Sequence, residues 1–426
     1  MARVTPPDHP DADRPIFGTA AIAALGGVFE FYDFVIFAVF ARQIGHAFFP
    51  PEAGEHVRTL QAFAVFAVGY FARPFGGLLW AHVADRRGRA AVFSHTVVGM
   101  AACTLLIALL PGYATLGMAA PVLLVLLRLL QGMALGGELP ASICWLGEHA
   151  GPRRVGIGMA MLLAGVNSGL LLGQGVSLAL EAIFGTQAHG EWAWRLAFVF
   201  GSVVGVVGWA VRRHVGETRA FMQMQHSGAT ERLPILALLR AHPLPALAGF
   251  LMCSMHAWLV AALYLTVANL LQQRFDMPFA TAERVGLTAS CLGSVAYLFS
   301  GWLGDRVGAR RVAGVALVLV ALAAWPAYRS VTADFTAPLV LLGALSGLFV
   351  GAYLPLLPPL FPPAVRVSGL AASYDLAAAI VGGSGPFLML WLDREAGLPA
   401  VAAAMAGFAV LALTGLAMSV RLSRHT

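Results

Sequence analysis

The sequence predicts an all-α integral membrane protein with twelve transmembrane helices, arranged as two pseudo-symmetric six-helix halves. Of its 426 residues, 59% are hydrophobic and 11% are charged, whereas soluble domains carry about 25% charged residues. Twelve apolar stretches of membrane-spanning length follow one another, and one charged motif occurs in both halves. The charges are too few to cover a soluble protein of this length, so we expect the bilayer to surround it.

Each apolar stretch is long enough to cross a hydrocarbon core as a helix, which takes about 20 residues. Glycine and proline interrupt several of them, and membrane helices tolerate both. In chain order the predicted spans are 16–41, 58–81, 90–110, 117–140, 155–183, 193–212, 243–271, 284–303, 311–329, 336–360, 367–391 and 398–420.

The longest segment between spans separates the first six from the last six, and it sets the domain organisation. The predicted units are a cytoplasmic N-terminal tail at 1–15, an N-terminal half at 16–212, a central cytoplasmic loop at 213–242, a C-terminal half at 243–421 and a short cytoplasmic tail at 422–426.

The arginines predict the orientation in the membrane. All 27 basic residues are arginines; with a cytoplasmic N-terminus, 18 lie in cytoplasmic segments and 7 in outer segments. Because basic residues favour the cytoplasmic side, we expect both termini in the cytoplasm and a bacterial inner (plasma) membrane location. The arginines are scattered and form no basic patch, so no nucleic-acid partner is expected.

A repeat relates the two halves. The segment "AHVADRRGRA" follows the second span and "GWLGDRVGARR" follows the eighth. Asp85 aligns with Asp305 and Gly88 with Gly308, at an offset of 220 residues. Two six-span halves in parallel orientation are a known transporter plan.

These motifs carry a family resemblance. The D-R-x-G-R loop in both halves of a twelve-span chain resembles the major facilitator superfamily. The segments "FEFYDF", "RLLQGMALGGE", "EHAGPRRVG" and "WRLAFVFGSVVGVVGWAVRRHVGETRAF" are similar to its metabolite:proton symporter family, and the matches extend from about residue 26 to 390. The resemblance implies the major facilitator fold, proton-driven transport of citrate, tricarballylate, 2-oxoglutarate, shikimate or zwitterionic osmolytes, and usually a monomer.

The sequence departs from the family pattern at three positions. Ala81 stands where the loop motif prefers glycine, Asp375 where the family usually has asparagine, and Pro359 where it usually has glutamate. These departures leave the substrate and the direction of transport open.

Two carboxylates lie in the first apolar stretch, "GGVFEFYDFVIFAVF". Glu30 and Asp33 are three residues apart and therefore share a helix face. A charge in hydrocarbon is costly, and intramembrane acids mark ion pathways by default. We expect proton coupling here, with a structural salt bridge as the alternative; the sequence leaves open which acid titrates. Asp375, in the eleventh span, is a third coupling candidate, and the alternative for it is pairing with Arg366 or with a neighbouring backbone group near the inner surface.

Arg128 lies near the middle of the fourth span, with Gln131 on the same face. A lone arginine in the membrane needs an anionic partner. Arg128 either pairs with Glu30 or Asp33, or it binds a substrate carboxylate through two hydrogen bonds. We place Arg128 and Gln131 in the predicted substrate site.

Other polar side chains within spans complete that predicted site. Arg73 either contacts substrate or packs and snorkels inward. His256 either relays protons or packs as a neutral ring. Tyr264 and the cofacial pair Asn167 and Gln174 are expected to line a polar cavity.

The loop motifs and one further acid are predicted to act as gates. As the resemblance implies, the loop residues form inter-helix ion pairs that lock the outward-facing state, while Glu138 organises the inner gate. The predicted gating residues are Asp85, Arg86, Arg89, Glu138, Asp305, Arg306 and Arg310.

The function expected from the sequence is secondary active transport: symport of a small organic carboxylate with protons, by alternating access. The alternatives are a proton-driven exporter of a carboxylate-rich metabolite, such as a carboxylate siderophore, and a carrier of a zwitterionic solute. No HExxH, CxxC pair, nucleophile elbow or GxxxxGK[ST] occurs. We therefore expect no enzyme, no bound metal and no cofactor beyond the proton gradient.

Overall fold

The computed structural model describes residues 16–87, 89–134, 138–149, 154–212, 242–362 and 365–422. Within these ranges the regular secondary structure is entirely helical, which confirms the predicted fold class. Seven of the helical segments are long and apolar enough to cross a membrane by length and composition. Each of the twelve stretches predicted from the sequence overlaps at least one helix.

The N-terminal half runs from Ile16 to Arg212, and shorter helices join its long ones. It consists of α1 (Ile16–Val39), α2 (Ala41–Phe48), α3 (Glu55–Arg87), α4 (Arg89–Leu109), α5 (Tyr113–Leu116), α6 (Ala119–Ala134), α7 (Glu138–His149), α8 (Val155–Ala188), a π-helix η2 (His189–Ala193) and α9 (Trp194–Arg212).

The C-terminal half runs from Pro243 to Leu422. It consists of α12 (Pro243–Leu259), a π-helix η3 (Val260–Leu265), α13 (Val267–Phe275), α14 (Phe279–Val307), α15 (Ala309–Ser330), α16 (Ala337–Tyr353), the short 3-10 helices η4 (Leu354–Leu356) and η5 (Pro358–Leu360), α17 (Arg366–Ala377), a π-helix η7 (Ala378–Gly382), α18 (Gly383–Ala396) and α19 (Leu398–Leu422). Helix α14 begins five residues before the predicted span, whereas the predicted central loop lies almost wholly outside the described residues.

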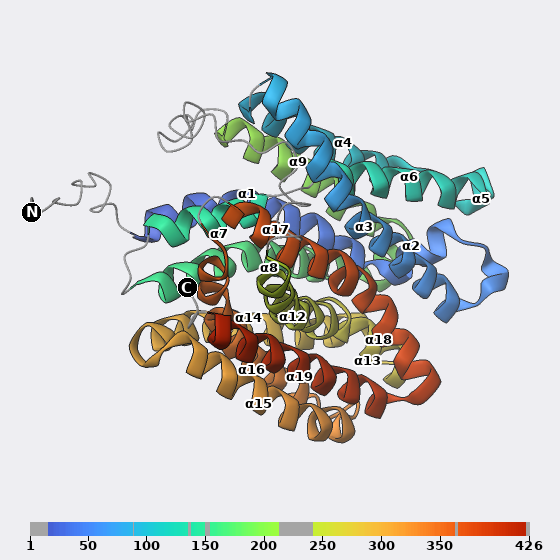
Figure 1. The fold of residues 1–426 in the computed structure, drawn as a ribbon. Helices are drawn as coiled ribbons and strands as arrows, with labels where there is room; N and C mark the ends of the chain where they lie inside the picture. Colours follow the sequence, from blue (N-terminus) through green and yellow to red (C-terminus); the bar gives the residue numbers. More distant parts are fainter. Residues whose placement is uncertain are drawn as a thin grey trace, which may run out of the picture.

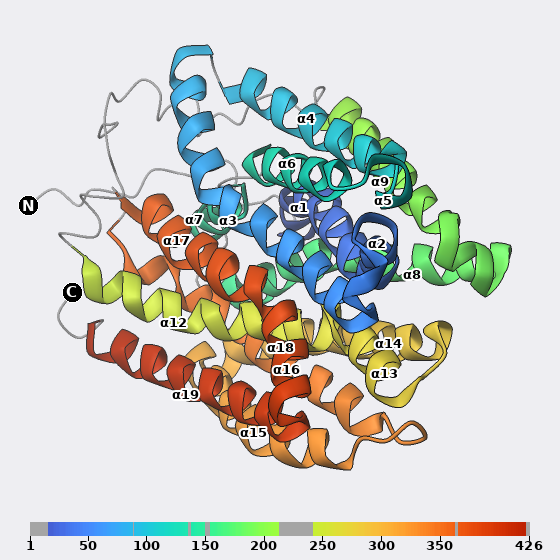
Figure 2. The same ribbon diagram turned by 90° about the vertical axis from the view of Figure 1, so that its right-hand side faces the viewer.

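The two halves lie side by side as two layers of roughly parallel and antiparallel helices (Figures 1 and 2). We call the end of the bundle where α1 begins and α19 finishes the proximal end, and the opposite end the distal end. Helix α8 packs on α1 within its own half and on α14 of the other half. Helix α3 packs on α18 and η7 across the same interface, so these pairs join the halves.

The π-helices are features that the hydrophobic pattern did not predict. Two of them lie in the C-terminal half: η3 follows α12, and η7 lies between α17 and α18. A π-turn holds an extra residue per turn and commonly occurs at functional sites. Both segments face the N-terminal half, and both line the cavity described below.

Small residues set the closest approach within the N-terminal half. Gly132 of α6 crosses Gly69 of α3 so tightly that a Cβ at position 132 would overlap the Gly69 carbonyl and touch Ala72. Helices in lipid gain little from hydrophobic burial against one another, and they associate instead through such close packing. This crossing brings Arg128, one turn before Gly132, against α3.

The crossing yields a stability prediction. Gly132→Ala should lower the thermal unfolding midpoint of the detergent-solubilised protein, because overpacking costs about 1–3 kcal/mol. Gly99→Ala on α4 is the matched control, since a Cβ there meets no atom within 4 Å. Helix propensity favours alanine at both positions by about 1 kcal/mol, so equal shifts in the two variants would contradict the packing argument.

Candidate functional site

Four side chains from three helices of the N-terminal half form a buried polar network. Asp33 on α1 accepts hydrogen bonds from the hydroxyl of Thr104 on α4 (2.6 Å) and the amide nitrogen of Gln131 on α6 (2.5 Å). The same amide nitrogen donates to Thr104 Oγ1 (2.9 Å), and Arg128 donates to the Gln131 oxygen (2.6 Å). Arg128 Nη1 lies 3.6 Å from Asp33 Oδ2. All four residues are 0% exposed.

Aromatic rings surround the cation of this network. The Arg128 guanidinium lies 4.1 Å from the ring centroid of Phe37, 5.0 Å from that of Phe34 and 5.6 Å from that of Phe66. Ring faces attract a desolvated cation. Among the described residues, Nε and Nη2 of Arg128 have no hydrogen-bond partner, so the guanidinium is held by Asp33, Gln131 and these rings.

The network follows one of the alternatives that the sequence left open for Arg128. Arg128 and Gln131 contact Asp33, and neither lines the cavity between the halves. A buried ion pair depends on both partners, because removing one leaves an uncompensated charge. The side chain of Glu30, one turn away on α1, lies outside the described part of the structure.

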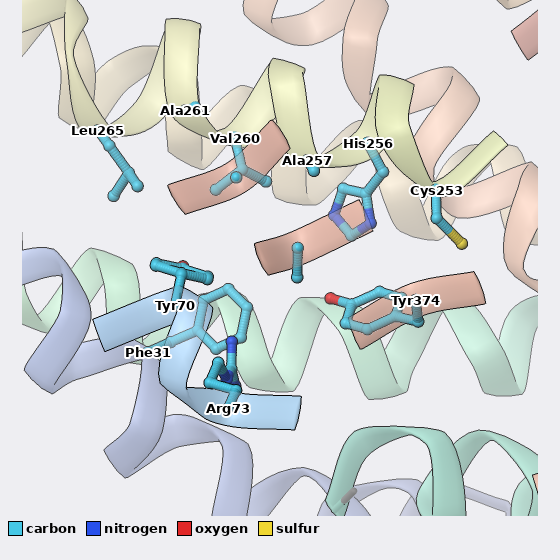
Figure 3. A pocket seen from close by; sticks show the side chains of 12 residues that line it. Phe31, Tyr70, Arg73, Cys253, His256, Ala257, Val260, Ala261, Leu265 and Tyr374 are labelled. Atoms are coloured by element: carbon cyan, nitrogen blue, oxygen red, sulfur yellow. The ribbon is translucent and has the colours of Figure 1, made fainter. Parts of the chain in front are cut away.

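A cavity lies between the two halves beside this network. Its empty volume, counted together with the open space at its mouth, is ≈ 420 Å³. In Figure 3 the side chains of both halves point into it: the N-terminal half contributes Phe31, Tyr70 and Arg73, and the C-terminal half faces them from the opposite wall. The remaining lining residues are Cys253, His256, Ala257, Val260, Ala261, Leu265, Tyr374, Ala378 and Gly382.

Arg73 is the cationic residue of the described cavity lining. Its guanidinium lies over the rings of Tyr70 (5.1 Å) and Phe34 (5.2 Å), and its charge interacts with that of Asp375 on α17 of the other half. Arg73 is thus an electrostatic neighbour of Asp375, and Arg366, the partner considered from the sequence, donates its Nε–H to the Phe361 carbonyl (3.4 Å).

His256 occupies the opposite wall of the cavity. Its Nδ1 shares a hydrogen bond with the Tyr353 hydroxyl (2.6 Å), and its ring contacts those of Tyr353 and Tyr374 at centroid distances of 5.3 and 6.0 Å. The residue is 5% exposed. One ring nitrogen is thus oriented by a tyrosine, an arrangement that fixes the plane of the imidazole at the cavity wall.

Phe34 connects the cavity to the buried network. The guanidinium groups of Arg73 and Arg128 both lie over its ring, at 5.2 and 5.0 Å from the centroid. Its ring also packs on Tyr70 with 4.6 Å between centroids, and Phe34 is the chain neighbour of Asp33. The Asp33–Arg128 pair and the cavity cation Arg73 are therefore separated by a single aromatic ring, so a change in the charge of Asp33 alters the electrostatic environment of Arg73.

Three predicted cavity residues instead occupy contacts between helices. Asn167 donates to Ser294 Oγ (2.7 Å), and Gln174 donates to the carbonyl of Tyr264 (3.1 Å); both bonds join α8 to the C-terminal half. The Tyr264 hydroxyl bonds to the Gly343 carbonyl and to Ser346, each at 3.1 Å. In this structure the polar groups of these residues hold helices together, and their role in a cavity wall stays a prediction.

At the proximal end, one loop of the repeat contacts the other half, and its role as a gate stays a prediction. Asp305 accepts hydrogen bonds from the backbone N–H groups of Gly156 (2.7 Å) and Ile157 (2.9 Å) at the start of α8. A carboxylate is well placed at a helix N-terminus, where N–H groups are unpaired. Gly308 follows with φ of 99°, a conformation that favours glycine, so the motif turns the chain and locks the halves together.

The other predicted gating residues are less engaged or lie outside the described side chains. The Arg306 guanidinium lies 4.0 Å above the ring of Trp302 on its own helix, and Arg310 is exposed. Within the described residues Asp305 thus bonds to backbone rather than to the arginine that was expected. The side chains outside the described part are those of Asp85, Arg86, Arg89 and Glu138.

Sequence reasoning missed several residues of the site. Thr104, Phe34, Tyr70 and Tyr374 were not predicted, although each of the three aromatic residues lies within one turn of a predicted charged residue. That adjacency is a usable signal. For Thr104 the sequence offered none, because a lone threonine in an apolar span commonly bonds its own helix, as Thr104 also does to the Met100 carbonyl (2.9 Å).

The buried Asp33–Arg128 ion pair leads to a prediction about the stability of the protein. Arg128→Gln should lower the unfolding midpoint strongly, since removing one partner of a buried ion pair costs about 3–5 kcal/mol. Adding Asp33→Asn to that variant should restore part of the loss, because no uncompensated charge remains. Thermal unfolding of the two single variants and the double variant gives the coupling energy; strictly additive effects would contradict a direct interaction.

Comparisons with known proteins agree with this architecture. Residues 23–296 match the family model described as "Major Facilitator Superfamily". The chain is 31% identical to an inner membrane metabolite transport protein of Escherichia coli (strain K12) over 97% of both chains. It is 31% identical to the shikimate transporter of the same strain, over 89% of each chain, and 32% identical to a citrate-proton symporter of Klebsiella pneumoniae, over 89% of this chain and 87% of the relative.

Solved structures show the same fold. A crystal structure of a D-xylose-proton symporter matches with a TM-score of 0.69 at 18% identity, covering 95% of this chain and 97% of that one. A proton:xylose symporter bound to 6-bromo-6-deoxy-D-glucose gives 0.72 at 14% identity, over 94% of each. The chain therefore belongs to the major facilitator superfamily and, within it, to the metabolite:proton symporter family, whose members are transporters and not enzymes.

Proposed function

We propose that this protein carries a small organic carboxylate, of the citrate or dicarboxylate type, together with protons across the bacterial inner membrane by alternating access. The proposal places the proximal end and both termini in the cytoplasm, as the arginine bias favours. One observation supports it above the others: Arg73 in the cavity and Arg128 in the Asp33 network share the ring of Phe34.

This arrangement supplies a physical reason for coupling. When Asp33 takes up a proton, Arg128 loses its anionic partner and leaves a net positive charge in a region of low dielectric constant. A substrate carboxylate bound at Arg73, one ring away, compensates that charge. Proton and anion therefore each favour the binding of the other, and such coupling is reciprocal.

The cavity residues have distinct proposed roles. Arg73 binds the carboxylate, since a guanidinium presents paired donors to its two oxygens. His256, oriented by Tyr353, donates or accepts a hydrogen bond to a hydroxyl or second carboxylate of the substrate. The π-helices η3 and η7 form the part of the wall that shifts as the halves rock. The cycle draws on the proton gradient, with no further cofactor, and we propose a monomer as the working unit.

A zwitterionic solute is the second candidate, because Asp375 interacts with Arg73 across the cavity interface. A carboxylate at Arg73 and a cationic group near Asp375 satisfy both charges. The proline/betaine transporter of Salmonella typhimurium is 28% identical over 87% of this chain. Betaine and proline therefore belong in the transport assay beside the organic acids.

The coupling role of Asp33 predicts a split between two transport modes. In proteoliposomes with an acidic exterior, wild type should accumulate labelled citrate, 2-oxoglutarate or shikimate. Asp33→Asn should lose at least tenfold of this accumulation, because the amide binds no proton at these pH values. Exchange of internal for external substrate should persist, since it needs no net proton movement. Equal accumulation by both proteins would refute the assignment of Asp33.

The role of Arg73 predicts a change in substrate affinity. Arg73→Gln should raise the KM for the transported anion about tenfold or more, the expected loss of a charge-assisted hydrogen bond of roughly 1.5–3 kcal/mol. Arg274→Gln is the control: this distal arginine bonds Asp393 at 2.8 Å and lies away from the cavity. If the KM is unchanged in Arg73→Gln, the anion site is elsewhere.

The direction of transport is read from the same proteoliposomes. Efflux of the anion driven by inward proton flow, without uptake, favours the alternative of a proton-driven exporter.

A further inference from the structure

The helix pair that joins the two halves carries a polar stripe. On α14, Glu283, Ser294 and Asp305 recur every 11 residues, close to three full turns, so they face one direction. Asp305 bonds Gly156 at the proximal end of α8, and Ser294 bonds Asn167 in its middle. Helix α8 therefore follows the stripe, and Glu283 faces its distal part.

Glu283 is buried there without a partner. It is 1% exposed, and neither carboxylate oxygen has a hydrogen-bond partner among the described residues. The antiparallel register fixed by the two bonds above places the turn of α8 that carries Ser177 opposite Glu283. Ser177 Oγ and Gln174 Oε1 are buried and likewise lack partners. Gln174 lies against Gly286, one turn from Glu283, where a Cβ would be 3.2 Å from Nε2.

These three buried groups all have an oxygen atom without a hydrogen-bond partner among the described residues. A carboxylate and an amide oxygen accept hydrogen bonds only, and a hydroxyl has a single hydrogen to give. An ionised Glu283 therefore leaves the cluster with acceptors in excess, and a buried polar atom without a partner is costly. One proton on Glu283 changes an acceptor into a donor and removes the charge.

No described cation offsets the charge of Glu283. In the described part of the chain, no arginine or histidine forms an ion pair with its carboxylate. Arg284, the next residue, is exposed, and Arg274 is bonded to Asp393. Helix α16 holds no charged residue. The remaining titratable groups on elements packed against α14 are Glu181, His189, Glu191, Tyr264, Arg310, Arg311, Tyr328, Arg329 and Tyr353.

Packing alone does not require an acid at this position. The repeat offset of 220 residues, which aligns Asp85 with Asp305, aligns Glu283 with Phe63 on α3. Phe63 is 0% exposed, so an apolar side chain fills the corresponding place in the N-terminal half. The acid at 283 is a difference between two otherwise similar helices.

The distal ends of the halves are in contact around Glu283. One turn before it, the Phe279 ring stacks on Phe40, which lies between α1 and α2, at 6.4 Å between centroids and contacts His189 of η2 at 4.3 Å. His56 at the start of α3 bonds Gln273 of α13 (2.9 Å). Opening of the distal end separates α8 from α14 and brings water to Glu283.

We propose that Glu283 is a proton-binding site separate from Asp33, and that it must hold a proton before the distal ends of α8 and α14 can close. The two ends of the α8–α14 pair thus close with their carboxyl groups in opposite charge states. Asp305 closes the proximal end as a carboxylate with two N–H donors, whereas Glu283 is buried at the distal end only as the neutral acid. This inference rests on the proposed orientation, in which the distal end faces the outside.

A cysteine reporter tests the proposal without any substrate. In a transport-competent parent lacking the native cysteines, Ser177→Cys is exposed to a membrane-impermeant maleimide only when the distal end opens. Labelling rates are normalised to the unfolded protein at each pH, which removes the titration of the thiol itself. From pH 8.5 to 5.5 we expect the normalised rate to fall, by at most tenfold per pH unit for one proton.

Variants at position 283 then decide the outcome. Glu283→Gln and Glu283→Met, which are neutral, should label slowly at every pH, and Glu283→Asp should keep the pH dependence. Glu181→Gln, on the same interface, is the matched control and should behave as the parent. A neutral variant that follows the parent, or a parent without pH dependence, would overturn the proposal. Since no substrate is used, the result is independent of whether a carboxylate is transported.

Discussion

The structure of the N-terminal half depends on one buried ion pair, Asp33 with Arg128. Neither charge is stable alone in hydrocarbon, so α1 and α6 must meet, and Thr104 and Gln131 must fill the remaining hydrogen-bonding positions. Glycines at the α3–α6 crossing allow the guanidinium to reach its place among three phenylalanine rings. The cavity lies beside this assembly and shares Phe34 with it, so the energetics of proton binding and of anion binding meet at one aromatic side chain.

The interface between the halves has a different character. It is held at intervals by single polar contacts: Asp305 at the proximal end, Asn167 and Gln174 in the middle, and His56 with Gln273 at the distal end. Such contacts are few and reversible, which suits surfaces that separate in each cycle. Within the N-terminal half, the Asp33 network, close glycine contacts and buried rings join the helices, so that they can move as a rigid unit.

The sequence was sufficient for the fold class and for several site residues. Low charge, apolar stretches and the repeat predicted the two-half helical architecture, and isolated charges within spans identified Asp33, Arg128, Arg73 and Asp375. The pairing could not be predicted, because choosing between Asp33 and a substrate anion as the partner of Arg128 requires the crossing geometry of α1, α4 and α6. Glu283 was missed because α14 begins at Phe279 and not at 284, so the acid seemed to precede the span. The π-helices leave no clear hydrophobic signature.

The separation of the ion pair along the chain has a consequence for biogenesis. Arg128 follows Asp33 by 95 residues, so α1 leaves the ribosome long before α6 exists. At synthesis rates of about 5–20 residues per second, the acid in α1 lacks its cation for roughly 5–20 s. An aspartate at the centre of an inserting helix costs about 2.5–3.5 kcal/mol, so α1 is a poor independent membrane segment. Insertion of the first helix is therefore less favourable before the fourth span arrives, and pairing with Arg128 links membrane integration of α1 to tertiary assembly of this half.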